Sequence, residues 1–198
     1  MLFPHILKGD NDLNQTLLVI DAQQELIDGN QEESEVFNKE KLIRNINLLI
    51  KQATDSGIPV VFVRDSDVAD GKGAGFQVHD QIKVPADALF FDKAATNCFH
   101  GTGLLNHLKS QEIGHIVIAG CKTQHCIDSA VRTATLNGFD VTLAGDAHST
   151  TDSDSLSAEQ IINHHNETLH GHYNVEHFSI VRNIAEDLFH PLHDSYRE

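Results

Sequence analysis

The apolar residues of the chain fall into short runs separated by longer stretches of mixed character. Five of these runs are almost continuously apolar, at residues 16–21, 59–65, 88–93, 115–120 and 140–146. Such runs are typical of strands that are buried on both faces of a parallel sheet. A sixth strand is expected over residues 175–181.

Helical spacing of apolar residues appears between several of these strands. Apolar positions keep to one helical face over residues 42–53 and again over 104–108. Ser157 and Gln160 have the spacing of a capping box, which predicts the start of a further helix. Alternation of strand and helix implies right-handed crossovers. We therefore predict an α/β fold with three layers, α/β/α, around a doubly wound, six-stranded parallel sheet.

Length and composition favour one domain over residues 1–198. With 198 residues and 40% hydrophobic content, the chain suffices for one sizeable core and is short for two. The irregular stretch 66–87 is interpreted as a surface excursion near the site. The first residues lack a basic region followed by a long apolar region, and no apolar run has the roughly 20 residues that span a bilayer, so we expect a cytoplasmic protein. Three cysteines, an odd number, argue against a disulfide framework.

The charge of the chain excludes some partners. A formal net charge of −15 repels phosphate backbones and anionic lipids, so we expect no nucleic-acid and no membrane partner. The acidic stretch "NQEESE" at residues 30–35 is interpreted as an exposed loop.

Reactive side chains stand where the predicted strands end. The first strand ends with Asp21, the second with Asp65 and the third with Lys93, and the fourth leads into Cys121 and Cys126. In open α/β sheets, ligands bind beyond the carboxyl ends of the strands. Each residue alone is weak evidence, but their coincidence at one edge predicts an active site there.

The position of Cys126 favours it as a nucleophile. Apolar spacing over residues 127–134 predicts a helix that starts near Thr123 to Cys126. In a first helical turn, free N–H groups and the helix dipole favour a thiolate, so we expect a lowered thiol pKa. The same N–H groups could hold an oxyanion. Cys121 is expected to be a small buried side chain, and zinc is a poor explanation for a C-x4-C pair.

Four stretches together resemble the isochorismatase-like cysteine hydrolases, which include nicotinamidases, carbamoylsarcosine amidohydrolases and streptothricin hydrolase. They are "LLVIDAQQ", "FDKAATNCFHGTGL", "IAGCKTQHCIDSAVRTA" and "GFDVTLAGDAHSTTDSD". The resemblance implies a Rossmann-like sheet of order 3-2-1-4-5-6 and a catalytic triad of Asp21, Lys93 and Cys126. It also implies a cis peptide bond between Cys121 and Lys122, with the N–H groups of Lys122 and Cys126 forming an oxyanion hole.

By the same resemblance, the expected reaction is cleavage of a carbon–nitrogen bond in a small amide, ureido compound or lactam through a Cys126 thioester. The alternatives are an isochorismatase-type hydrolase of a non-amide substrate and a non-catalytic binding member of the fold. We expect no cofactor, and a homo-oligomer, either a dimer or a tetramer.

Three further residues are candidates for substrate binding, namely Gln23, Phe76 and His100. Ordinary packing is as good an explanation for Phe76. Nicotinamidases begin a metal site with Asp-x-His after the second strand, whereas this chain reads Asp65-Ser66-Asp67, so no metal is expected. The histidines of "HHNETLHGHY" are interpreted as a solvated helix end rather than a metal site.

Overall fold

The computed structural model describes residues 14–197. The first residues, in which we expect no targeting signal, lie outside this described part. The strands are β1 (Asn14–Ile20), β2 (Val60–Asp65), β3 (Leu89–Lys93), β4 (Ile113–Cys121), β5 (Asp140–Ser149), β6 (Tyr173–Asn174) and β7 (His177–Arg182). The helices are α1 (Gln24–Asp28), α2 (Lys39–Asp55), α3 (Gly73–Phe76), α4 (Leu104–Ser110), α5 (Asp128–Leu136) and α6 (Ala158–Leu169). The short turns are η1 (Val68–Gly71), the π-helical η2 (Thr123–Ile127) and η3 (His193–Tyr196).

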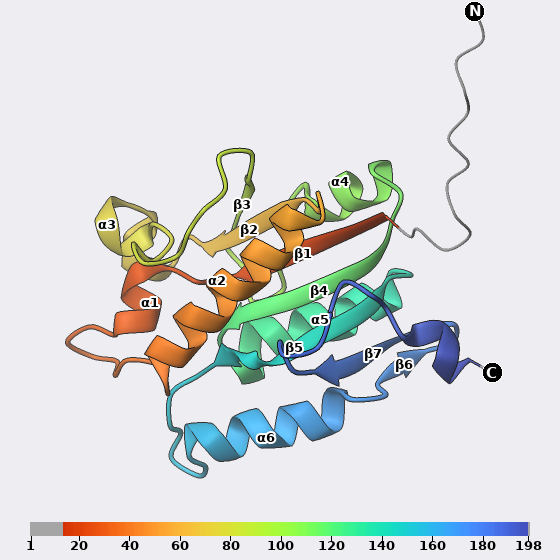
Figure 1. Cartoon of the computed structure of the whole chain (residues 1–198). Helices are drawn as coiled ribbons and strands as arrows, with labels where there is room; N and C mark the ends of the chain where they lie inside the picture. Colours follow the sequence, from red (N-terminus) through yellow and green to blue (C-terminus); the bar gives the residue numbers. More distant parts are fainter. Residues whose placement is uncertain (1–13, 198) are drawn as a thin grey trace, which may run out of the picture.

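The strands form one sheet of order β3-β2-β1-β4-β5-β7-β6. All neighbours from β3 to β7 are parallel, which confirms the six predicted parallel strands and their order, with β7 as the sixth. The structure adds β6, a two-residue strand antiparallel to β7. The strands run toward α1 and α3, so their carboxyl ends meet on that side of the molecule (Figure 1).

Hydrophobic residues form a core on each face of the sheet. In β1, Leu17 and Val19 join the cluster that includes α2, whereas Leu18 and Ile20 join the cluster that includes α4 and α5. This alternation follows from the two-residue period of a strand. Helix α2 therefore covers one face, and α4 and α5 cover the other, as Figure 1 shows. The three-layer prediction is confirmed.

Strand β3 differs from the expectation that all strands are buried on both faces. It lies at the edge of the sheet, and its Leu89 and Phe90 are 40% and 43% exposed. A run of apolar residues does not reveal whether a strand is central or at an edge. The predicted capping box at the start of α6 is present, because the Ser157 side chain accepts from the Gln160 N–H and the Gln160 side chain accepts from the Ser157 N–H. Within residues 14–197, no helix is both long and apolar enough to cross a membrane.

Candidate active site

The residues at the strand ends meet at one pocket. Asp21 follows β1, Asp65 and Lys93 end β2 and β3, and Cys126 lies in the turn after β4. A cavity of about 310 Å³ opens there, lined by Asp21, Asp65 and Cys126 among others. The predicted convergence of these side chains is therefore what the fold produces.

The ammonium group of Lys93 joins three groups of the site. Its Nζ lies 2.9 Å from Asp21 Oδ2 and 3.4 Å from Cys126 Sγ, and it donates a hydrogen bond to Asp65 Oδ2. The Lys93 side chain is fully buried. Burial lowers the pKa of Lys93. Its neighbours Asp21, Cys126 and Asp65 raise this pKa by more, so the net shift is upward. Lys93 therefore stays charged and holds the three groups together.

Asp21 is a buried carboxylate with free acceptor sites. It is 1% exposed, and neither carboxylate oxygen has a hydrogen-bond partner among residues 14–197; the Lys93 contact is an ion pair. Burial raises the pKa of Asp21 to about 6, although the Lys93 charge opposes this shift. Asp21 also has a left-handed backbone, with φ of +49°, a conformation that concentrates at functional sites. At neutral pH this side chain is mostly ionised and able to accept a proton.

The environment of Cys126 corrects the expectation of a lowered thiol pKa. The regular helix α5 begins only at Asp128, and Cys126 lies within the preceding π-helical turn η2. Burial and the nearby negative charge of Asp21 raise the pKa of Cys126 to about 12, against the opposing effect of Lys93. The thiol is therefore neutral at rest, and a base must remove its proton.

The connection from β4 to Cys126 is shaped by backbone contacts. Gly120 has φ of +124°, and a Cβ there would lie 1.9 Å from the Ile20 carbonyl oxygen, so only glycine fits between the two strands. The peptide bond between Cys121 and Lys122 is cis. The Lys122 carbonyl accepts from the N–H groups of His125 and Ile127, at 3.1 and 3.3 Å, which closes the turn around Cys126.

The pocket also includes residues for which no role was predicted from the sequence. Asn30 and Glu33 come from the exposed "NQEESE" loop, Glu25 comes from α1, and His125 comes from the η2 turn. Glu33 pairs with the ammonium group of Lys122, which places this loop over the carboxyl end of β4. The spacing of the loop residues carries no signal for this contact, because it depends on how the chain folds back.

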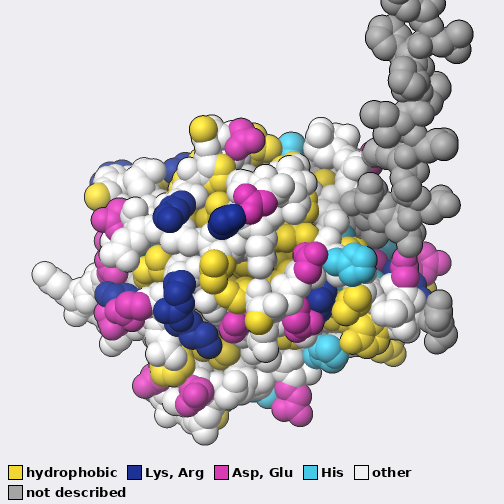
Figure 2. Space-filling model, viewed as in Figure 1, with side chains coloured by type: hydrophobic (Ala, Val, Ile, Leu, Met, Phe, Trp, Pro, Cys, Tyr) yellow, Lys and Arg dark blue, Asp and Glu magenta, His cyan; other side chains and the backbone are white. Residues whose placement is uncertain are grey.

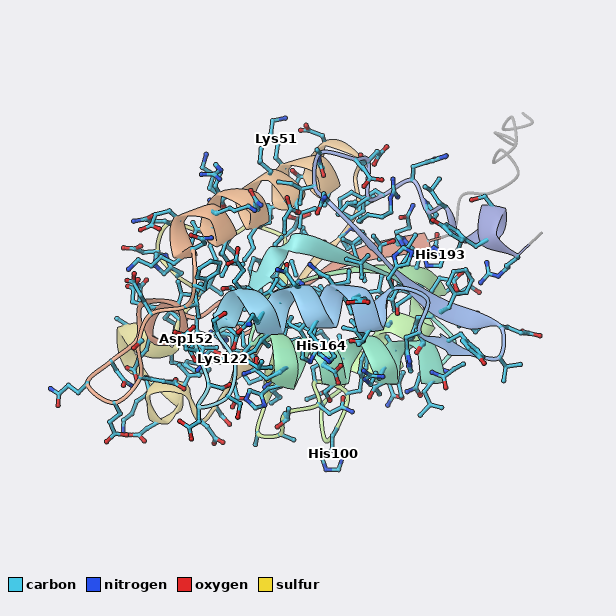
Figure 3. All side chains as sticks on the ribbon, turned by 90° about the horizontal axis from the view of Figure 1, so that it is seen from below. Lys51, His100, Lys122, Asp152, His164 and His193 are labelled. Atoms are coloured by element: carbon cyan, nitrogen blue, oxygen red, sulfur yellow. The ribbon has the colours of Figure 1, made fainter. Side chains whose placement is uncertain are left out.

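The three proposed substrate-binding residues lie elsewhere. Gln23 is fully buried. Its side-chain amide donates to the carbonyls of Asp65 and Phe76 and accepts from the Asp65 N–H, so it stabilises the backbone at the end of β2. Phe76 is buried and stacks under the Arg64 guanidinium, 4.4 Å from ring centroid to Cζ. His100 is exposed on a loop and points outward, away from Lys122 (Figure 3). The structure brings none of the three to the pocket lining.

Comparison with known proteins finds relatives named as isochorismatase family proteins. The uncharacterized isochorismatase family protein YrdC of Bacillus subtilis (strain 168) is 27% identical over 138 residues, covering 67% of this chain and 72% of YrdC. A solved isochorismatase family protein superimposes with a TM-score of 0.77 at 24% identity, over 86% of this chain and 98% of that one.

Two structural neighbours are named for amidase activities. N-carbamoylsarcosine amidase from Thermoplasma acidophilum has a TM-score of 0.68 at 21% identity, over 88% of this chain and 98% of that chain. Pyrazinamidase of Pyrococcus horikoshii, solved with zinc, has the same TM-score at 19% identity, over 86% of this chain and 99% of that chain. At these identities the likeness shows a shared fold.

The zinc in that neighbour raises the question of whether this chain offers a metal site. Among the described residues, one group of three potential ligands stands close enough, namely Asp21, Asp65 and Cys126, whose ligand atoms lie within 4.8 Å of one another. The Lys93 ammonium contacts all three and supplies the positive charge that a metal would bring. These residues do not fit a bound metal, and no step below uses one.

The family assignment rests on most of the chain. The sequence profile of the isochorismatase domain matches residues 15–166, which include every strand that contributes to the pocket. The chain therefore belongs to the isochorismatase family, a family of hydrolases.

Proposed function

We propose that this protein is a cysteine hydrolase that cleaves a carbon–nitrogen bond of a small molecule through a thioester on Cys126. The observation that carries the proposal is the contact of Asp21, Lys93 and Cys126 at one pocket, with a neutral thiol beside a carboxylate that has free acceptor sites. The amidase names of two structural neighbours support the choice of a carbon–nitrogen bond.

In the first half of the proposed reaction, Asp21 takes the thiol proton as the Cys126 sulfur attacks the carbonyl carbon. The N–H groups of Lys122 and Cys126 stabilise the oxyanion that forms. The carbon–nitrogen bond then breaks, and the nitrogen leaves with the proton held by Asp21. Lys93 stays charged throughout and compensates the negative charge that moves between Asp21 and the sulfur.

In the second half, water attacks the thioester while Asp21 accepts a proton from the water. The carbon–sulfur bond breaks, the acid product leaves, and the sulfur regains its proton from Asp21. Asp65 takes no part in proton transfer in this scheme. It holds Lys93 in place through its own hydrogen bond.

The test is a screen of primary amides, ureido compounds and lactams for release of ammonia or amine. Cys126→Ala should abolish release, whereas Cys98→Ala, a change of the same size at a buried cysteine outside the pocket, should retain it. Turnover of an amide that survives Cys126→Ala would refute the thioester scheme. Turnover of a vinyl ether that is insensitive to Cys126→Ala would identify the protein as an isochorismatase-type hydrolase instead.

A further inference from the structure

The pocket carries a net negative charge. Five carboxylates line it, those of Asp21, Glu25, Glu33, Asp65 and Asp67. Two ammonium groups offset them, from Lys122 in the lining and Lys93 behind it. With histidine counted as neutral, an excess of three negative charges faces the cavity.

Two of these carboxylates have no cationic partner among residues 14–197. Glu25 is held by the uncharged amide of Asn30, whose Nδ2 donates to Glu25 Oε1 at 3.0 Å. Asp67 is exposed and follows Asp65, to whose Oδ1 it donates its own N–H at 3.0 Å. Glu33, which also lines the pocket, is paired with Lys122. No cation in the described residues therefore compensates Glu25 and Asp67 at the cavity.

Several basic side chains gather on another surface. Figure 2 shows Lys and Arg side chains gathered on the face that α2 covers. There Arg44, Lys51 and Lys83 line a separate groove between α2 and the segment before β3. The negative charge of the pocket is thus a local feature rather than only a consequence of the net charge of the chain.

A buried acceptor adds a second, independent indication of a ligand. Asp21 is 99% buried and lines the same cavity; its Oδ2 lies 2.9 Å from the Lys93 ammonium, whereas its Oδ1 has no hydrogen-bond partner in the described residues. A buried carboxylate oxygen that has no donor is costly unless a donor arrives. The site is therefore suited to a ligand that brings hydrogen-bond donors and positive charge.

We propose, building on the proposed function, that the substrate is a cationic amide, in which an ammonium or guanidinium group accompanies the scissile carbonyl. In this proposal the reacting carbonyl contacts Cys126, and the cationic group lies between Glu25 and Asp67 in the same cavity. An anionic substrate would meet three uncompensated negative charges and bind poorly.

The first test measures the pocket potential without requiring turnover. Cys126 is modified with methanethiosulfonates that carry a 2-aminoethyl (positive) or a 2-sulfonatoethyl (negative) group, and each rate is divided by that of the same reagent with a free small thiol. A local potential of a few kT predicts a ratio of roughly tenfold or more in favour of the cationic reagent. The ratio should shrink in 1 M salt, where screening acts over about 3 Å.

Variants that remove carboxylates inside and outside the pocket assign the effect to Glu25 and Asp67. Glu25→Gln combined with Asp67→Asn should reduce the normalised ratio at least about threefold. Glu176→Gln, which removes one charge in the turn between β6 and β7, should leave the ratio unchanged. A normalised ratio of one or below in the unmodified protein would overturn the proposal.

The second test uses three amides that share the CH2–CH2–CONH2 unit and differ in the charge of the terminal group: β-alaninamide, butyramide and succinamate. The expected order of kcat/KM is cation above neutral above anion, with roughly tenfold between the first two. Butyramide hydrolysed as well as β-alaninamide would overturn the cationic preference while leaving the hydrolase intact. If the reagents show the charge preference and Cys126→Ala leaves amide turnover unchanged, the proposed function fails and the charge preference of the pocket stands.

Discussion

Replacing Asp21 with asparagine should separate the reactivity of the Cys126 thiol from catalysis. The ligand atoms of Asp21 and Cys126 lie within 4.8 Å of each other, and the Asp21 charge is one of the causes that raise the thiol pKa from 9.0 to about 12. At that separation and an effective dielectric constant of ~20, two unit charges interact by about 3 kcal/mol, or about two pKa units. Removing the carboxylate should therefore increase the thiolate fraction at pH 7 by roughly ten- to a hundredfold.

Catalysis should change in the opposite direction. Loss of a positioned general base costs typically ~10²–10⁴-fold in rate, so amide turnover should fall by about that factor in Asp21→Asn. In the unmodified enzyme, kcat/KM should fall tenfold per pH unit below about 6, as Asp21 becomes protonated, and this acid limb should vanish in Asp21→Asn.

The assay is the rate of Cys126 alkylation by iodoacetamide, a neutral reagent, followed by peptide mass spectrometry. Cys98 and Cys121 serve as internal controls, because both are fully buried and burial raises their thiol pKa values. Asp67→Asn removes an exposed carboxylate of the same pocket and should change the rate by less than about threefold. If Asp21→Asn slowed alkylation as much as turnover, the account of a thiol held neutral by Asp21 would be wrong.

Three further predictions concern the scaffold of the site. Burial lowers the pKa of His148 to about 4 and of His115 to about 3. Below about pH 6.5 these histidines bind protons in the unfolded chain but stay neutral in the folded protein, so the free energy of unfolding should fall as the pH drops. Urea unfolding at pH 5 should show a loss of roughly 2 kcal/mol relative to pH 7, because the raised pKa of Asp21 partly offsets the effect of the two histidines; an unchanged midpoint would contradict the buried, neutral assignment. Gln23→Ala removes three buried hydrogen bonds and should cost about 3 kcal/mol of unfolding free energy, measured by the same urea titration, and a cost below about 1 kcal/mol would show that these bonds do not hold the site. Gly120→Ala should give little folded protein by circular dichroism, and a well-folded variant would mean that the two strands separate more easily than the 1.9 Å clash implies.

The arrangement of the site follows from the sequence where it depends on strand ends. A parallel sheet brings the carboxyl ends of its strands to one edge, so the places of Asp21, Lys93 and Cys126 at or just after strand ends predicted that they would meet. The capping box of Ser157 and Gln160 was equally local, because three residues of spacing define it.

Features that depend on tertiary contacts were not accessible in this way. The thiol of Cys126 was expected to be acidic from its place near a helix start, but burial and the Asp21 charge decide its pKa. Gln23 was expected to bind substrate, yet the backbone of Asp65 and Phe76 takes up its side-chain hydrogen bonds. The exposure of the loop that contains Glu33 was predicted correctly, but the contact of Glu33 with Lys122 follows only from the fold.

The central claim is that Cys126 carries the acyl group of an amide substrate during turnover, and intact-mass spectrometry of acid-quenched reactions tests it directly. With an amide found in the screen, the protein should gain the mass of the acyl group, located by peptide mapping on Cys126 and absent in Cys126→Ala, while Cys98→Ala still gains it. Continued amine release with no adduct at any quench time, together with undiminished turnover in Cys126→Ala, would contradict the account.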